Sequence, residues 1–129
     1  IAGALGVAVA LPERPIIAIS GDGSAMYTIQ SLWTAALLNL SIVFVILANR
    51  EYRVLKHNID TYRVRFAAGS NRPYPHMDLS PTLDFTALAR GMGITAERFE
   101  DPAALQRAIR AAVAKQGPHL IEVVVSGKQ

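Results

Sequence analysis

The chain has 129 residues, 51% of them hydrophobic and 18% charged, which predicts one globular domain, residues 1–129, with a sizeable core. The formal net charge is only +3 and the basic residues form no run, so a nucleic-acid partner is not expected. The absence of cysteine excludes disulfides and thiolate metal sites, and we expect a cytoplasmic protein.

The first predicted element is an apolar segment, residues 1–11 (IAGALGVAVAL). It is too short to span a bilayer and lacks the basic region and cleavage pattern of a signal peptide. We therefore expect a buried helix and no membrane association. Because the chain starts without Met, inside an apolar run, we also expect it to be cut from a longer polypeptide and truncated at its N-terminus.

Two short runs of β-branched residues follow, at residues 15–20 (PIIAIS) and 41–47 (SIVFVIL). Nearly continuous runs of this kind are typical of strands buried on both faces of a parallel sheet. Between them, apolar residues at helical spacing predict a helix with one buried face. Its members are Ile29, Leu32, Trp33, Ala36, Leu37 and Leu40. The three elements form a βαβ unit with a right-handed crossover.

The second half repeats the pattern after a loop at residues 59–83, which contains three prolines and no hydrophobic period. Asp84 is expected to cap a helix that ends at Gly91 or Gly93. A strand at residues 94–99 follows. The expected buried faces of this helix and the next are Phe85, Leu88, Ala89 and Met92, and Leu105, Ile109, Ala112 and Val113.

Asp101 and Pro102 form an N-cap and first-turn pair for that next helix, which runs to Gly117. A strand at residues 119–125 closes the sheet. The alternation of strands and helices predicts an α/β fold with an open, mostly parallel sheet and helices on both faces.

Residues 20–24 (SGDGS) and Asn49 each follow a predicted strand. In open α/β sheets, ligands bind beyond the carboxyl ends of the strands. The two glycines allow a tight turn, and the amides of Gly23, Ser24 and Ala25 at a helix start favour an anion such as a phosphate.

Asp22 is itself negative, however. Two like charges about 4 Å apart repel by about 4 kcal/mol at an effective dielectric constant of about 20. A cation must therefore accompany the phosphate. Carboxylate, amide and main-chain oxygens are ligands that Mg²⁺ takes together with phosphates and water, so the pattern predicts a magnesium-diphosphate site. The alternative is an ordinary Gly-Asp-Gly turn and an ordinary residue at a strand end.

Gly-Asp-Gly-Ser, followed by Asn49 after a hydrophobic strand, resembles the thiamine-diphosphate motif of the superfamily of pyruvate decarboxylase, acetolactate synthase and benzoylformate decarboxylase. Residues 11–52 and 117–125 also look like the C-terminal, diphosphate-binding domain of benzoylformate decarboxylase. The resemblance implies the thiamine-diphosphate-binding fold, with thiamine diphosphate and Mg²⁺ as cofactors.

The same resemblance assigns roles to individual residues. Asp22 and the side chain of Asn49 become Mg²⁺ ligands, with the backbone carbonyl of Glu51 as the third. The Glu51 carboxylate could also reach the metal, although such a side chain is more often solvated. The family usually has Gly where this chain has Arg50. The expected cofactor-binding residues are Gly21, Gly23, Ser24, Ala25 and Tyr52.

After the motif the resemblance implies a helix near the substrate, which makes Val54, Leu55 and Asn58 candidate pocket residues. The alternative for the first two is ordinary helix packing, and for Tyr52 a half-buried aromatic. Asn58 stands where benzoylformate decarboxylase has an aromatic residue, which argues against a phenyl-bearing substrate. His57 is a possible acid or base, whereas His76 and His119 are expected to be surface or core residues.

The function that the resemblance implies is 2-keto acid decarboxylation by a larger homo-oligomeric enzyme. The catalytic glutamate lies in an N-terminal pyrimidine-binding domain of the family, so we expect no catalytic residue in this chain and no activity from it alone. An acetolactate synthase-like carboligase and a non-catalytic magnesium-diphosphate-binding module are alternatives. A nucleotide-binding Rossmann domain and a phosphatase are disfavoured because GxGxxG, GxxxxGK[ST] and further acidic residues after the strands are missing.

Overall fold

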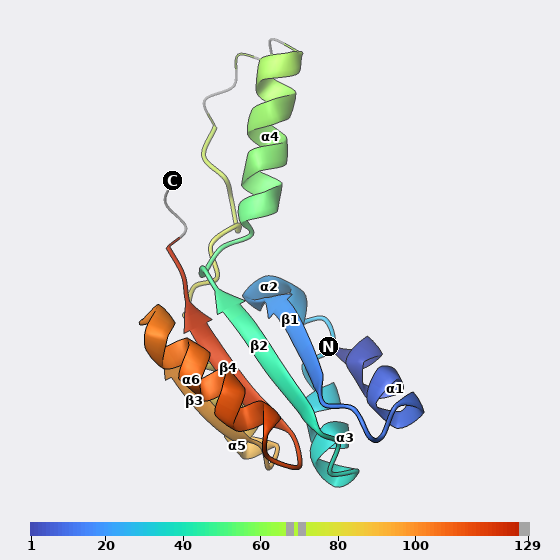
Figure 1. The fold of residues 1–129 in the computed structure, drawn as a ribbon. Helices are drawn as coiled ribbons and strands as arrows, with labels where there is room; N and C mark the ends of the chain where they lie inside the picture. The colour runs from blue at the N-terminus through green and yellow to red at the C-terminus, as the bar shows by residue number, and fades with distance from the viewer. Residues whose placement is uncertain (67–68, 70–71, 127–129) are drawn as a thin grey trace.

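The computed structural model describes residues 1–66, 69 and 72–126, and Figure 1 shows their arrangement. Four parallel strands form one sheet in the order β1-β2-β4-β3. They are β1 (Ile16–Gly21), β2 (Ile42–Ala48), β3 (Thr95–Phe99) and β4 (His119–Val124). The helices of the described residues are α1 (Ala2–Ala10), α2 (Asp22–Ala25), α3 (Ser31–Leu37), α4 (Arg53–Arg65), α5 (Phe85–Gly91) and α6 (Pro102–Val113).

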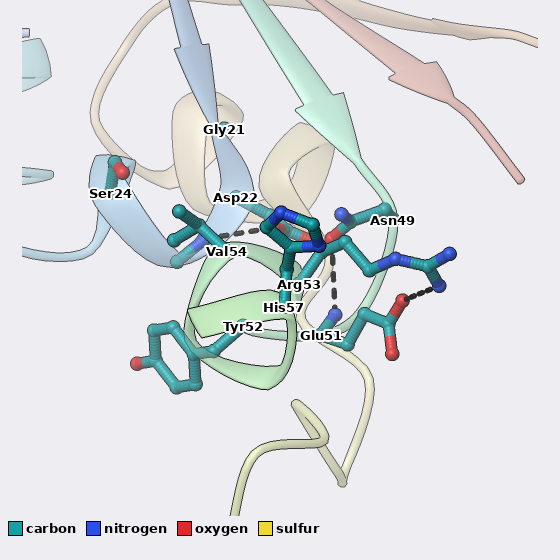
Figure 2. A pocket seen from close by; sticks show the side chains of 10 residues that line it. Gly21, Asp22, Ser24, Asn49, Glu51, Tyr52, Arg53, Val54 and His57 are labelled. Carbon is teal, nitrogen blue, oxygen red and sulfur yellow. Dashed lines mark hydrogen bonds and ion pairs between the residues drawn. The ribbon is translucent and has the colours of Figure 1, made fainter. Parts of the chain in front are cut away.

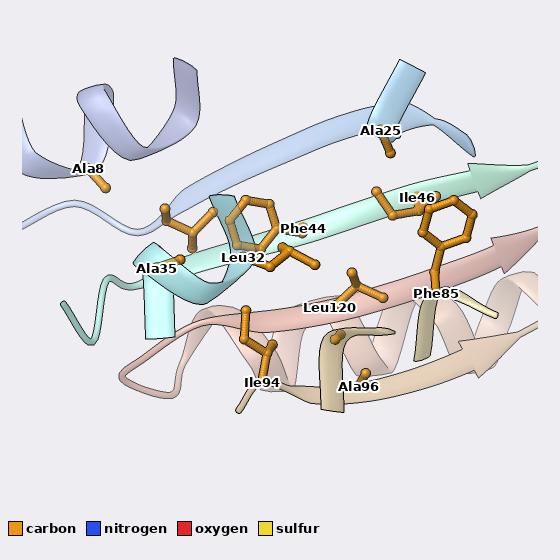
Figure 3. Close-up of a cluster of buried hydrophobic side chains, with 12 residues drawn as sticks. Ala8, Ala25, Leu32, Ala35, Phe44, Ile46, Phe85, Ile94, Ala96 and Leu120 are labelled. Carbon is orange, nitrogen blue, oxygen red and sulfur yellow. The ribbon is translucent and has the colours of Figure 1, made fainter. Parts of the chain in front are cut away.

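One face of the sheet carries the larger hydrophobic core, drawn in Figure 3. Phe44 and Ile46 of β2 and Leu120 of β4 point into it, because alternate residues of a strand face the same side. Helices α1, α3 and α5 cover this face. Their buried contributions include Ala8, Leu32, Ala35, Phe85 and Ala89.

The opposite face is covered by α6, which contacts β2, β3 and β4. Val43 and Val45 of β2 and Ile121 and Val123 of β4 pack there against Ala112. Leu105, Ile109 and Val113 pack against the same cluster, as their helical spacing predicts. The sheet therefore has helices on both faces, and the predicted α/β architecture is confirmed.

The predicted helix caps are also present. The carboxylate of Asp84 accepts a hydrogen bond from the Ala87 N–H at 2.9 Å, and that of Asp101 accepts one from the Ala104 N–H at 2.7 Å. After α5, Gly93 has a φ of +83°, and the Ile94 N–H reaches back to the Ala89 carbonyl at 2.9 Å. Gly93 is thus the glycine that terminates this helix.

The prediction of a buried N-terminal helix was wrong in one respect. Residues 2–10 do form a helix, but of these only Ala8 is buried, while Val7 and Val9 are exposed. The segment is apolar on all sides, so a single contact surface on the sheet cannot cover it. The helices of the described residues include none that is both long and apolar enough to cross a membrane.

The predicted loop at residues 59–83 begins too early. Helix α4 continues to Arg65, so residues 59–65 are helical, whereas residues 67–68 and 70–71 of the predicted loop lie outside the described part. None of the α4 residues is buried, and in Figure 1 the helix extends beyond the carboxyl ends of β1 and β2. Its weak apolar face explains why hydrophobic periodicity did not reveal its full length.

Two predicted burial patterns are partly wrong. Strand β1 alternates between half-buried and exposed residues, and Ile17 and Ile19 are exposed. It lies at an edge of the sheet, where α6 does not cover its outer face. In α3, Leu32 is buried as expected, but Trp33 and Leu37 are exposed, since Ala35 takes the inward position instead.

Candidate functional site

The Gly-Asp-Gly turn and Asn49 lie at the same edge of the sheet. Strands β1 and β2 are parallel neighbours, and their register pairs Gly21 with Leu47. The residues that follow both strands therefore enter one region, as the sequence predicts. There they line an open cavity of about 530 Å³, shown in Figure 2. Its lining comprises Gly21, Asp22, Gly23, Ser24, Asn49, Glu51, Tyr52, Arg53, Val54 and His57.

Asp22 is the buried acid of this cavity, with 4% of its surface exposed. One carboxylate oxygen accepts a hydrogen bond from the Gly23 N–H at 2.8 Å, and the other accepts one from the Arg50 N–H at 2.6 Å. The second bond joins the turn after β1 to the turn after β2. A carboxylate has about four acceptor positions, so two hydrogen bonds leave it free to bind a cation as well.

The turn after β2 places Asn49 and Arg50 in a defined geometry. The side-chain carbonyl of Asn49 accepts the Glu51 N–H at 3.1 Å. Arg50 has a φ of +62°, in the left-handed region where glycine fits without strain. This is the position at which the resemblance expects glycine. The Arg50 N–H bond to Asp22 helps to hold this conformation, and so does the Leu79 N–H, which donates to the Arg50 carbonyl at 2.9 Å.

Each oxygen of the Glu51 carboxylate is paired with a cationic side chain, so its negative charge is already balanced. One oxygen pairs with the Arg53 guanidinium at 2.9 Å, and the other accepts a hydrogen bond from the Lys56 ammonium. This arrangement favours the main-chain carbonyl of Glu51, rather than its side chain, as the group available to a metal. The assignment itself stays a prediction.

Gly23 is required by the close approach of Tyr52. A Cβ atom built on Gly23 would lie 2.5 Å from Cε1 of the Tyr52 ring, which is closer than carbon atoms can pack. Gly21 differs, because apart from its two neighbours in the chain no described residue has an atom within 4 Å of the position that its Cβ would occupy. The space beside Gly21 belongs to the cavity, so a ligand can approach the backbone there.

The first turns of α4 form another wall of the cavity, through Arg53, Val54 and His57. Figure 2 shows these side chains opposite the Gly-Asp-Gly turn. Of the three pocket residues that the sequence suggests, Val54 lines this cavity, whereas Leu55 and Asn58 do not. Arg53 was missed. Residues 53, 54 and 57 share one helical face, so extending the predicted helix to residue 53 would have identified it.

The remaining predicted residues lie away from the cavity. The methyl group of Ala25 is fully buried in the core, so at most its main-chain amide could contact a ligand. His119 opens β4, at the opposite end of the strands from the cavity. His76 is exposed in the segment before α5, as expected for a surface histidine.

The donors in this cavity suit magnesium better than a transition metal. Within the described residues, no cluster of three or more His, Cys, Asp or Glu side chains could hold a metal by itself. The cavity offers one carboxylate, one amide oxygen and nearby main-chain carbonyls. Mg²⁺ is commonly bound by few protein oxygens, with phosphates and water completing its octahedron. The residues present therefore fit a magnesium-diphosphate group.

Comparison with known proteins identifies a family that matches this chain. The family model described as "Thiamine pyrophosphate enzyme, C-terminal TPP binding domain" matches residues 1–123. A Mycobacterium tuberculosis protein named "Putative acetolactate synthase large subunit IlvX" is 44% identical over 95% of this chain and 24% of its own length. Benzoylformate decarboxylase of Pseudomonas aeruginosa is 40% identical over 93% of this chain and 21% of its own length.

A solved structure shows the same fold. The thiamine diphosphate-dependent 4-hydroxybenzoylformate decarboxylase of Rhodococcus jostii matches with a TM-score of 0.81 and 33% identity, over 95% of this chain and 22% of the other. This chain thus spans about a quarter or less of the length of each of these relatives.

Proposed function

This chain belongs to the thiamine pyrophosphate enzymes, as a C-terminal TPP-binding domain, and we propose that it binds the magnesium-diphosphate end of thiamine diphosphate in a larger 2-keto acid decarboxylase. The observation that carries the proposal is the pairing of Asp22 and Asn49 at the ends of two neighbouring strands, in one cavity.

We assign the metal to the side chains of Asp22 and Asn49 and to the main-chain carbonyl of Glu51. The buried Asp22 carboxylate supplies the negative charge that a dication requires. Gly21, Gly23 and Ser24 border the space for the diphosphate, and the Tyr52 ring packs closely against Gly23. Asp22, which follows β1, also accepts a hydrogen bond from the Arg50 N–H after β2, so it connects the ends of the two strands.

When bound, thiamine diphosphate supplies the nucleophilic carbon and accepts the electrons released with CO₂, and the protein binds and orients it. Arg53, Val54 and His57 form the α4 wall of the same cavity and therefore border the ligand. The activating glutamate, the rest of the substrate pocket and the homo-oligomeric partners are assigned to the remainder of the enzyme, including its pyrimidine-binding domain. The substrate is a small 2-keto acid.

A carboligase of the acetolactate synthase type is the second candidate, because a relative of that name is 44% identical to this chain. The two activities differ in product. Incubation of the full polypeptide with pyruvate, Mg²⁺ and thiamine diphosphate distinguishes them, since a decarboxylase releases an aldehyde and a carboligase releases acetolactate. A polypeptide that binds the cofactor but forms neither product from any 2-keto acid would be a non-catalytic binding module.

The proposed binding role is tested by calorimetric titration of the full polypeptide with thiamine diphosphate, with and without Mg²⁺. We expect Asp22→Ala and Asn49→Ala each to weaken Mg²⁺-dependent binding by on the order of tenfold or more, because each removes a metal ligand. Asp60→Ala is the matched control, since Asp60 lies on α4 outside this cavity. Unchanged binding in both ligand variants would overturn the proposal.

A further inference from the structure

Lys56 connects the metal-binding turn to a distant segment of the chain. Its ammonium group donates hydrogen bonds both to the Glu51 carboxylate and to the Asp78 carboxylate, the latter at 2.5 Å. The Lys56 and Glu51 side chains are only 17% and 13% exposed. Both carboxylates lie within ion-pair distance of this one ammonium group.

The main chain joins the same two segments. Glu51 and Asp78 form an antiparallel bridge. On either side of it, the Tyr52 N–H donates to the Met77 carbonyl at 2.7 Å and the Leu79 N–H donates to the Arg50 carbonyl at 2.9 Å. The segment at residues 77–79 thus lies along the turn at residues 50–52, and the Lys56 bridge spans the two side chains of the central pair.

We propose that Lys56 is a positioning residue for the metal site, and that with Asp78 it fixes Glu51 so that two metal ligands are held in place. The inference rests on the proposed function. Glu51 supplies the main-chain carbonyl assigned to the metal, and its N–H binds the side-chain carbonyl of Asn49. A displacement of Glu51 therefore moves both of these ligands.

We expect this network to influence metal affinity in the way that outer-shell groups do in other metal sites. Groups that orient metal ligands typically change metal affinity by about 10- to 100-fold when they are removed, although they do not touch the metal. Lys56 occupies such a place, because Glu51 belongs to the turn at residues 50–52 and Asp78 to the segment paired with that turn.

The test measures the dissociation constant of Mn²⁺ by electron paramagnetic resonance, on the full polypeptide with saturating thiamine diphosphate. We expect Lys56→Met to raise this constant about tenfold and to change the spectrum of bound Mn²⁺, because the ligands are no longer held. Lys56→Arg, which keeps both ion pairs, should restore most of the affinity. Asp78→Asn, at an exposed position, should weaken binding severalfold without affecting folding.

The matched control is Asp60→Asn. Asp60 also links α4 to the segment before α5, since it accepts a hydrogen bond from the Tyr74 hydroxyl. It does not contact the turn at residues 50–52, so the Mn²⁺ constant should stay within about twofold of the unmodified protein. An equal effect of Asp60→Asn and Asp78→Asn would overturn the inference, because general loosening of the segment would then explain both.

Failure of this inference differs from failure of the proposed function. If Asp22→Ala abolishes Mn²⁺ binding while Lys56→Met and Asp78→Asn leave it unchanged, the metal site stands and the positioning role is wrong. If Asp22→Ala itself has no effect, the proposed metal site is wrong. If Lys56→Met does not fold, the Asp78→Asn result decides.

Discussion

At the scale of single residues, the turn after β2 shows how one backbone conformation is held by its neighbours. Arg50 adopts a left-handed conformation, which costs a residue with a side chain about 1–2 kcal/mol. Its N–H is bound by the buried Asp22 and its carbonyl by the Leu79 N–H. These bonds explain how the turn forms without the glycine that the resemblance predicts at this position.

Asp84 is a second residue whose role can be followed in detail. Its carboxylate caps α5 by accepting the Ala87 N–H, accepts the Thr86 hydroxyl at 2.7 Å, and pairs with Arg98 at 3.1 Å. The bond to Ala87 is the main cause that lowers the pKa of Asp84 below its ordinary value, followed by the bond to Thr86. The ionised carboxylate is therefore more favourable in the folded chain than in the unfolded one.

Replacing Asp84 with Ala should lower the free energy of unfolding by about 1 kcal/mol at neutral pH, the usual effect of losing an N-cap. Because the pKa is lowered on folding, this contribution is present above the unfolded pKa of about 4 and is lost as the pH falls through the folded pKa. Urea unfolding of both proteins from pH 7 to pH 3 measures it. Asp84→Asn is the control, because it keeps a capping acceptor. If the difference in free energy of unfolding between the unmodified chain and Asp84→Ala grew toward pH 3, the assignment would be contradicted.

At the scale of elements, β1 and β2 have similar sequences but different surroundings. On the α6 side, the register places Ile19 of β1 beside Val45 of β2. Ile19 is 68% exposed and Val45 is 4% exposed, since α6 covers β2 and not β1. Within the described residues, the outer face of β1 is therefore left without a covering helix.

Substitution by threonine at the two neighbouring positions, Val45 and Ile19, should change the free energy of unfolding by different amounts. Val45→Thr places a hydroxyl in the core and should lower the free energy of unfolding by about 1–3 kcal/mol. Ile19→Thr should change it by less than about 0.5 kcal/mol, because the side chain is already in contact with solvent. Chemical denaturation of the two variants provides the comparison, and equal losses would show that the β1 face is covered in solution.

At the scale of the whole molecule, the cavity is bounded by two walls. One is the edge of the sheet with the Gly-Asp-Gly turn, and the other is the start of α4 (Figure 2). Helix α4 has no buried residue, and its Tyr62, Val64 and Phe66 region is exposed. Efficient chemistry on a reactive cofactor requires that water be excluded from the site. This open site does not exclude water.

We expect the 129-residue chain by itself to release no CO₂ from 2-keto acids at an enzyme-like rate, even with Mg²⁺ and thiamine diphosphate present. The open cavity and the assignment of the activating glutamate to another domain are the reasons. A CO₂ assay with a panel of 2-keto acids tests this, with the full polypeptide as the positive control. Turnover by the chain alone that disappears in Asp22→Ala would refute the expectation.

Much of the fold and part of the site follow from local sequence. The β-branched runs and the caps at Asp84 and Asp101 depend on interactions within a few residues, so they could be recognised without a structure. The end of α5 was narrowed to Gly91 or Gly93, and the structure selected Gly93. The positions of Asp22 and Asn49 after two strands also follow from the sequence, because parallel strands of a βαβ unit end at one edge.

Other features depend on contacts between residues far apart in the chain. Sequence periodicity cannot show that β1 lies at an edge, since strand order is set by the packing of all elements. Nor can it show that Lys56 bridges Glu51 and Asp78, or that Arg53 joins the cavity wall. The sequence by itself determined which residues are proposed to bind a magnesium-diphosphate group, because the proposal depends on their chemistry and their local turns. Only the tertiary structure decided which side chains hold those residues in place, because long-range packing brings the holding groups together.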